Sequence, residues 1–317
     1  MSQLRPDEIQ ERAREARRLS SPCRLCPRRC GVDRAAGERG YCGAGPHPAI
    51  ATAIPHFGEE PPLVTAGGAG TIFFSRCNLR CVYCQNHQIS QGDLGAEIAP
   101  EDLAGKMLEL QELECANIEP VSPSHHLSGF LESLANAVEK GLRLPVVYNT
   151  NGYENPETLD LLEGIVDVYV PDLKYASSDA ARRYSDAGDY VPVARQAVLK
   201  MHAQVGNLVV DLHGGALRGI ILRHLLLPGG NAGTRDTLLW IKDNLPQTVT
   251  ISLMAQYSPL HRSREFPPLD RAVTAAEYEE AVDLAWDLGF ENVFVQDIES
   301  QTAGIPDFGS SRPFNWD

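Results

Sequence analysis

Short apolar runs alternate with amphipathic runs over most of this chain, from about residue 71 onward. Short runs of apolar and β-branched residues are typical of buried strands, whereas apolar residues spaced three and four apart are typical of helices. The pattern predicts strands at 71–75, 118–122, 145–149, 166–171, 219–225, 248–254 and 292–296. It predicts helices at 100–115, 127–140, 155–164, 177–184, 191–205, 234–244 and 275–288.

Regular alternation of strands and helices predicts parallel strands that are joined by right-handed crossovers. Six such units, of which the first begins at residue 71, indicate an α/β fold built as a partial (β/α)6 TIM-like barrel. In such barrels the functional side chains lie at the carboxyl ends of the strands and in the loops that follow. The polar motifs of this sequence mostly follow predicted strands, so we look for chemistry there.

The eight cysteines divide the chain unevenly, because none occurs after Cys115. A segment rich in Pro and Gly, residues 55–62, reads as a connector between a Cys-rich start and a larger body. We therefore predict a small N-terminal metal-binding module at 1–66. The body at 67–317 is predicted to contain the barrel and a C-terminal extension of helix and strand.

The strongest single motif is C-x3-C-x2-C, formed by Cys77, Cys81 and Cys84 directly after the first predicted strand. Three thiolates can bind three irons of a [4Fe–4S] cube, and nothing in this run supplies a ligand for the fourth iron. An open iron favours catalysis over simple electron storage. The alternative is a zinc site that a distant residue completes.

A second group of cysteines lies near the N-terminus, within about 20 residues, at Cys23, Cys26, Cys30 and Cys42. Four soft ligands can close either a tetrahedral zinc site or a second [4Fe–4S] cluster, and the spacing alone does not choose between them. A closed site of this kind favours a structural or electron-relay role.

The net charge and the lengths of the apolar stretches indicate which classes of binding partner to expect. The 317 residues carry a formal charge of -14, from 28 basic and 42 acidic side chains, which disfavours nucleic acid. We expect no membrane association, because no apolar stretch approaches the ~20 residues of a membrane span. The first residues lack the apolar core of a signal peptide, so we expect a soluble, cytoplasmic protein whose cysteines bind metal instead of forming disulfides.

These motifs together resemble the radical S-adenosylmethionine (SAM) superfamily, and in particular its pyruvate formate-lyase activating-enzyme-like (PflX-type) group. The resemblance rests on the C-x3-C-x2-C run with Tyr83 before its last cysteine, and on several stretches elsewhere. These stretches are Gly67-Gly-Ala-Gly-Thr-Ile-Phe-Phe-Ser, Pro145-Val-Val-Tyr-Asn-Thr-Asn-Gly-Tyr, Val168-Tyr-Val-Pro-Asp-Leu-Lys-Tyr, Leu222-Arg-His-Leu-Leu-Leu-Pro-Gly and Met254-Ala-Gln-Tyr. The Cys-rich start matches the same group.

The resemblance implies an enzyme, a radical SAM oxidoreductase. A site-differentiated [4Fe–4S] cluster on Cys77, Cys81 and Cys84 would cleave SAM reductively to a 5′-deoxyadenosyl radical, which abstracts hydrogen from a substrate. The residues implied to contact SAM are Tyr83, Ser122, Ser124, Asn149, Asn151, Asp172, Lys174, Arg223 and Gln256.

The sequence departs from relatives in two of these motifs. Ser122 and Ser124 stand where relatives carry a Gly-Gly-Glu motif, and ordinary turn-capping serines are the alternative interpretation. Asn149 replaces an aspartate that helps to hold a cation, so a cation site here should be weaker or absent. The adjacent pair His125 and His126 reads as a helix cap and a surface residue.

Several partners and functions stay open. A glycyl-radical-enzyme activase would act on a protein, and modification of another peptide or of a small molecule is a second hypothesis. Electrons would come from a donor such as flavodoxin or ferredoxin. The alternative from another class is a non-catalytic iron–sulfur redox relay or sensor, which would explain the cysteines but not the polar motifs at successive strand ends.

Overall fold

The structure, a computed structural model, describes residues 5–65, 67–299 and 304–314. Its strands form one mixed sheet in the order β10-β9-β8-β6-β5-β4-β2-β1-β3, and β7 pairs with β8 outside this path. The strands are β1 (Ala49–His56), β2 (Ala69–Phe74), β3 (Ala96–Glu97), β4 (Ile118–Val121), β5 (Val147–Thr150), β6 (Val168–Pro171), β7 (Val209–Val210), β8 (Ala216–Leu225), β9 (Thr250–Met254) and β10 (Asn292–Phe294).

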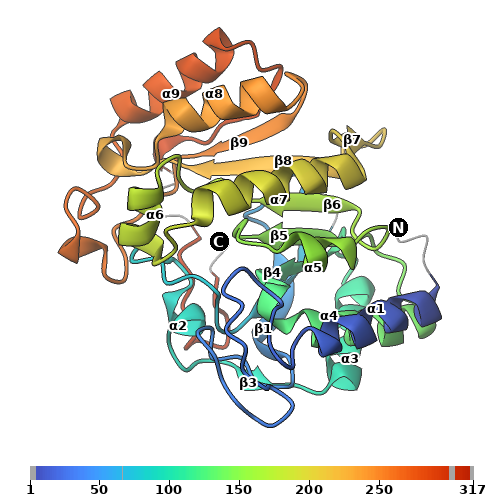
Figure 1. Ribbon diagram of the computed structural model, residues 1–317. Coiled ribbons are helices and arrows are strands. Elements are labelled where there is room, and N and C mark those ends of the chain that lie inside the picture. The colour runs from blue at the N-terminus through green and yellow to red at the C-terminus, as the bar shows by residue number, and fades with distance from the viewer. Residues whose placement is uncertain (1–4, 66, 300–303, 315–317) are drawn as a thin grey trace.

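Helices follow most of the parallel strands, as the sequence pattern predicts. They are α1 (Pro6–Arg18), α2 (His87–Ser90), α3 (Pro100–Glu112), α4 (Leu127–Glu139), α5 (Pro156–Asp160), α6 (Ser178–Ser185), α7 (Tyr190–Val205), α8 (Thr234–Asn244) and α9 (Ala275–Asp287). Figure 1 shows α1 lying along α4, while α8 and α9 lie together beside β9. Local sequence fixes some boundaries: Ser177 caps α6, and Thr274 with Glu277 forms a capping box at α9.

The parallel strands are arranged in chain order, each beside its predecessor, from β2 through β4, β5, β6, β8 and β9 to β10. A doubly wound sheet would instead reverse direction at a switch point. An α/β sheet of sequential parallel strands is therefore confirmed, and it is consistent with the predicted partial barrel. All six residues of β2 are buried, as expected for a strand covered on both faces.

The N-terminal part of the sheet differs from the expectation. β1 was not predicted, and it pairs antiparallel with β2 from Ile50 to His56. Residues 55–62, which we expected to be a connector, therefore begin inside strand β1. Within this segment and after the strand, Glu60 is buried and Glu59 is nearly so. Helix α1 and the short strands β3 and β7 were also missed, because their apolar patterns are short or are interrupted by charge.

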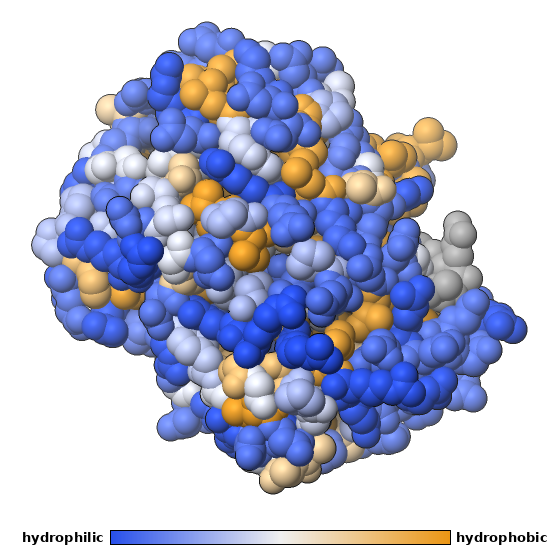
Figure 2. Space-filling view, viewed as in Figure 1, coloured by the Kyte–Doolittle hydropathy of each residue, from blue (hydrophilic) through white to orange (hydrophobic). Residues whose placement is uncertain are grey.

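The outer surface is mainly hydrophilic in the view of Figure 2, and an apolar projection stands out at the β7–β8 hairpin. Val209, Leu212 and Leu217 are exposed there. Among the described residues, no helix is both long enough and apolar enough to cross a membrane.

Candidate functional site

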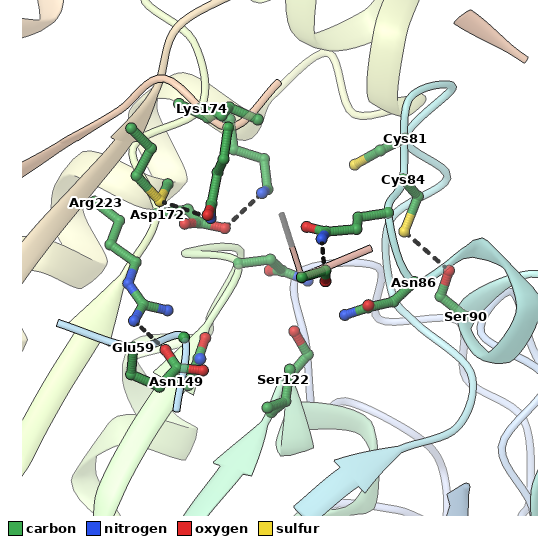
Figure 3. A pocket seen from close by; sticks show the side chains of 18 of the residues that line it. Glu59, Cys81, Cys84, Asn86, Ser90, Ser122, Asn149, Asp172, Lys174 and Arg223 are labelled. Carbon is green, nitrogen blue, oxygen red and sulfur yellow. Dashed lines mark hydrogen bonds and ion pairs between the residues drawn. The ribbon is translucent and has the colours of Figure 1, made fainter. Parts of the chain in front are cut away.

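A cavity of about 500 Å³ lies at the carboxyl ends of the parallel strands. The loop after β2 lines one side with Cys77, Cys81 and Cys84, and the ends of β5, β6 and β8 supply the facing polar groups (Figure 3). This is the position at which parallel α/β barrels carry their functional residues. The cavity thus unites the cysteine motif with side chains from distant segments.

Each thiol of the C-x3-C-x2-C motif has a polar group beside its sulfur. Asn151 Nδ2 lies 3.4 Å from Cys77 Sγ, and Ser185 Oγ donates to Cys81 Sγ at 2.9 Å. Ser90 Oγ lies 3.2 Å from Cys84 Sγ. These three contacts come from three different elements, so several parts of the fold hold the motif in place.

Burial raises the pKa of all three thiols. The pKa of Cys77 rises to about 12 and that of Cys84 to about 11, and burial also raises the pKa of Cys81 although Lys174 opposes the shift. Thiols with such pKa values are neutral at neutral pH, and metal ligation would release their protons.

The donor set fits an iron–sulfur cluster. Soft thiolates are the ligands that such clusters take, and hydrogen bonds to the sulfurs are among the features that tune them. Among the described residues, no three His, Cys, Asp or Glu side chains are placed to hold a single metal ion. A [4Fe–4S] cube takes one thiolate per iron, so its cysteines need not converge on one point.

Asp172 and Lys174 form an ion pair that lines the cavity opposite the cysteines (Figure 3). They follow β6 at alternating positions, as the sequence predicts for side chains that share a face. Burial alone would lower the pKa of Lys174, but Asp172, with smaller contributions from Cys81 and Tyr190, raises this pKa well above the usual value. The pair therefore places an ammonium and a carboxylate side by side in the cavity.

Three predicted amide and hydroxyl residues also line the cavity: Ser122, Asn149 and Asn151. Ser122 has a positive φ of 50°, which turns the chain sharply after β4. Asn149 Nδ2 donates to Glu119 Oε1 at 2.8 Å. Burial, followed by the nearby Glu59, raises the pKa of Glu119 well above its usual value, which disfavours a second anion at the Asn149 position.

Ser124 does not line the cavity, unlike the other predicted contacts. It is buried and donates its hydroxyl proton to Glu154 Oε1, which also accepts from Thr150 Oγ1 at 2.5 Å. Its hydroxyl is therefore used inside the core. The turn after β4 directs Ser122 toward the cavity and Ser124 away from it. Sequence spacing alone does not predict which serine faces the cavity.

Arg223 lines the cavity, but two carboxylates already engage it. Its Nε donates to Glu60 Oε1 at 2.8 Å, and its Nη2 donates to both Glu59 and Glu60. Burial alone would raise the pKa of Glu59, but Arg223 and then His56 lower it below the usual value. We expected a free guanidinium that could bind a ligand carboxylate. The guanidinium of Arg223 is instead part of a buried salt bridge with Glu59 and Glu60.

Sequence reasoning missed Glu59 and Glu60. One signal could have found them: an arginine in the apolar strand 219–225 needs a carboxylate partner once it is buried. The Pro- and Gly-rich composition of 55–62 concealed that partner.

Tyr83 and Gln256 complete the predicted set, and both line the cavity. Tyr83 packs edge-on against Tyr257, with ring centroids 5.7 Å apart. Gln256 Oε1 accepts from Gln296 Nε2 at 3.3 Å, which ties the β9 end to the β10 end. These contacts hold one wall of the cavity in place.

His126 stands at the N-cap position of α4, as expected of one member of the pair, but its side chain makes no capping hydrogen bond, and neither histidine is the surface residue that we expected. Both are buried, and both Nε2 atoms approach the Ser75 carbonyl oxygen, at 2.9 and 3.0 Å. Burial lowers the pKa of His125 to about 4, so the pair is neutral at neutral pH. They support the end of β2 immediately before the cysteine loop.

The N-terminal cysteines lie in one folded segment, with Cys23, Cys26 and Cys42 buried and Cys30 exposed. Burial raises the pKa of Cys26 to about 12, with smaller contributions from Cys42 and Cys23, which lie near it. Buried Arg34 donates to Cys42 Sγ at 3.4 Å.

This segment contacts the cysteine loop of the cavity directly. Arg28 Nε donates to the Asn78 carbonyl oxygen at 3.0 Å, and the guanidinium of Arg28 lies 3.8 Å from the ring centre of Tyr41. Arg28 follows Cys26 by two positions, and Asn78 follows Cys77 directly. One side chain therefore joins the two groups of cysteines.

The family model of the radical SAM superfamily matches residues 71–215. "Uncharacterized protein MJ0674" of Methanocaldococcus jannaschii is 31% identical over 89% of this chain and 79% of its own length. The crystal structure of a radical SAM methyltransferase from Sphaerobacter thermophilus is similar with a TM-score of 0.47 and 12% identity, covering 72% of this chain and 67% of that one.

Proposed function

Since the chain belongs to the radical SAM superfamily, we propose that it is a radical SAM enzyme that abstracts hydrogen from a substrate held in the cavity above β5, β6 and β8. The single observation that carries the proposal is that cavity, where the three cysteines face polar side chains from successive strand ends. When bound together, a [4Fe–4S] cluster and SAM supply a carbon radical that removes a hydrogen atom. The protein's own contribution is placement and exclusion of water.

We infer that the Asp172–Lys174 pair orients SAM. SAM carries an α-ammonium and an α-carboxylate. The Asp172 carboxylate can bind the ammonium, and the neighbouring Lys174 ammonium can bind the carboxylate. Arg223 is excluded from this role because Glu59 and Glu60 neutralise it. Asn151 and Ser122, which line the same cavity, supply further polar contacts.

A SAM titration followed by EPR tests the proposal. The anaerobically reconstituted and reduced protein should give a [4Fe–4S] signal that changes on addition of SAM, because only an open iron can accept a new ligand. Cys81→Ala should lose this signal, whereas Cys115→Ala, at a buried thiol outside the cavity, should keep it. A signal that ignores SAM would instead support an iron–sulfur relay or sensor.

We further propose a second metal site at Cys23, Cys26, Cys30 and Cys42, with zinc and [4Fe–4S] as its two candidate occupants. A single zinc would require these thiols to move together, because no three such side chains of the described residues are placed to hold one ion. The support is the burial of three of these thiols, the Arg34 contact to Cys42, and the link through Arg28 to the cysteine loop. Metal analysis of a Cys77→Ala/Cys81→Ala/Cys84→Ala variant decides between them. Zinc retained by this variant would identify a zinc site, and iron retained with sulfide would identify a [4Fe–4S] cluster. A variant that retains no metal would contradict the second site.

A further inference from the structure

A chain of buried hydroxyl groups ends at the sulfur of Cys81. Tyr83 Oη lies 2.7 Å from Tyr175 Oη, which lies 2.6 Å from Ser185 Oγ, and Ser185 Oγ donates to Cys81 Sγ at 2.9 Å. The side-chain contacts of the other two motif cysteines are longer: Cys84 Sγ lies 3.2 Å from Ser90 Oγ, and Cys77 Sγ lies 3.4 Å from Asn151 Nδ2 and 3.8 Å from Asn78 Oδ1. Cys81 is therefore the one motif cysteine that a continuous hydroxyl chain supports among the described residues.

Backbone hydrogen bonds hold Cys81 in place beside this chain of hydroxyl groups. The amide of Arg80 donates to the Ser185 carbonyl at 3.2 Å, and the amide of Val82 donates to the Tyr184 carbonyl at 2.8 Å. The peptides on both sides of Cys81 are thus attached to the end of α6. Ser185, Tyr175 and Tyr83 are all buried, so these hydroxyls are largely withdrawn from bulk water.

The direction of the protons follows from the chemistry of the last acceptor. A cysteine that ligates iron is a thiolate, which can only accept a hydrogen bond. Ser185 must then donate its hydroxyl proton to the sulfur and accept a hydrogen bond from the Tyr175 hydroxyl. The Tyr175 hydroxyl in turn accepts a hydrogen bond from the Tyr83 hydroxyl. All three hydroxyl dipoles point toward Cys81, and bonds aligned in this way strengthen one another in a low-dielectric interior.

On the basis of the proposed function, we propose that Ser185, Tyr175 and Tyr83 are positioning residues that set the reduction potential of the cluster through Cys81. Donors to a cluster sulfur favour the reduced state, which carries more negative charge. Because Tyr83 also lines the cavity, the chain runs from the cavity wall to the cluster ligand.

Redox potentiometry of the SAM-responsive cluster signal tests this proposal. Ser185→Ala should lower the midpoint potential most, Tyr175→Phe less and Tyr83→Phe least, since each removes a donor one step farther from the sulfur. A hydrogen bond to a charged group shifts an equilibrium by about tenfold or more, and tenfold corresponds to about 59 mV for one electron. Ser185→Ala should therefore approach that value.

Tyr184→Phe is the matched control, because the Tyr184 hydroxyl donates to Asn231 Oδ1 and lies outside the chain. Its potential should equal that of the wild type. An unchanged potential in Tyr175→Phe, or equal shifts in Tyr175→Phe and Tyr184→Phe, would overturn the inference even if Ser185→Ala fails to hold the cluster. Absence of any SAM-responsive cluster in the wild type would overturn the proposed function as well, so the two failures are distinguishable.

Discussion

Asp172 is the residue whose removal should separate SAM binding from cluster binding. It lies in the cavity beside Lys174 and contacts none of the three cysteines through a hydrogen bond. Asp172→Ala should weaken SAM binding by about tenfold, the typical effect of losing a hydrogen bond to a charged group. Anaerobic equilibrium dialysis with labelled SAM measures this change.

The control for this experiment is Asp179→Ala, which removes an exposed carboxylate that pairs with Arg182 in α6. Its SAM affinity and iron content should match the wild type. Unchanged SAM affinity in Asp172→Ala, or loss of its iron, would contradict the role assigned to the Asp172–Lys174 pair.

Glu154 should make stability depend on pH. Burial raises its pKa from 4.5 to about 7, although hydrogen bonds from Ser124 and Thr150 oppose the shift. Between these two pH values the folded protein holds a proton that the unfolded chain has lost, so stability falls as the pH rises from about 4.5 to about 7. Above pH 7 this contribution is constant.

Glu154→Gln should remove this fall, because glutamine stays neutral. Urea denaturation at pH 5 and pH 8 should give midpoints that differ less in the variant than in the wild type. Glu157→Gln, at an exposed carboxylate nearby, should behave like the wild type. A wild-type difference that survives in Glu154→Gln would show that other groups titrate.

The turn after β1 illustrates an interaction between elements that no local pattern reveals. Glu59 and Glu60 reach Arg223 in β8, which follows them by 164 and 163 positions respectively, and hold its charge inside the sheet. A buried charge is costly unless it is paired, so the segment after β1 and the strand β8 depend on each other.

Glu60→Gln should therefore destabilise the fold by about 1–3 kcal/mol, the typical cost of weakening a buried hydrogen bond to a charged group. Urea denaturation with a fixed metal content measures the loss. Glu265→Gln, which removes an exposed partner of Arg262, should leave the midpoint unchanged. Equal midpoints in wild type and Glu60→Gln would mean that Glu59 alone satisfies Arg223.

The periodicity of the sequence predicted the parallel strands well because their signal is local. Strand β9 and helix α8, for example, lie within two residues of the predicted ranges. β1 was missed because its apolar run, interrupted by Thr52 and Pro55, precedes the alternating region and pairs antiparallel. Pairing partners are set by tertiary contacts, which a local pattern does not contain.

The candidate site was predictable in part, for the same reason. Residues at strand ends, such as Asp172 and Lys174, could be placed in the cavity because alternation fixes their face. Ser124 and Arg223 could not be judged correctly, because their partners Glu154 and Glu59 come from segments that the sequence gives no means of bringing near. Which hydroxyl or guanidinium is free for a ligand is a property of the folded chain.

The whole molecule joins the N-terminal cysteine segment, the cysteine loop and the strand ends, and the last two of these line one cavity. Arg28 links the first two, and Ser185 and Asn151 link the cysteine loop to α6 and to the end of β5. This arrangement supports reductive chemistry on SAM inside a cavity more than it supports electron transfer alone, which needs no cavity of about 500 Å³.

The most direct test is the formation of 5′-deoxyadenosine. The protein is purified and reconstituted without oxygen, given SAM and dithionite, and compared with Cys77→Ala by liquid chromatography and mass spectrometry. The account predicts 5′-deoxyadenosine from the wild type and none from the variant. Equal amounts from both proteins, or none from a wild type that holds its cluster and binds SAM, would contradict it.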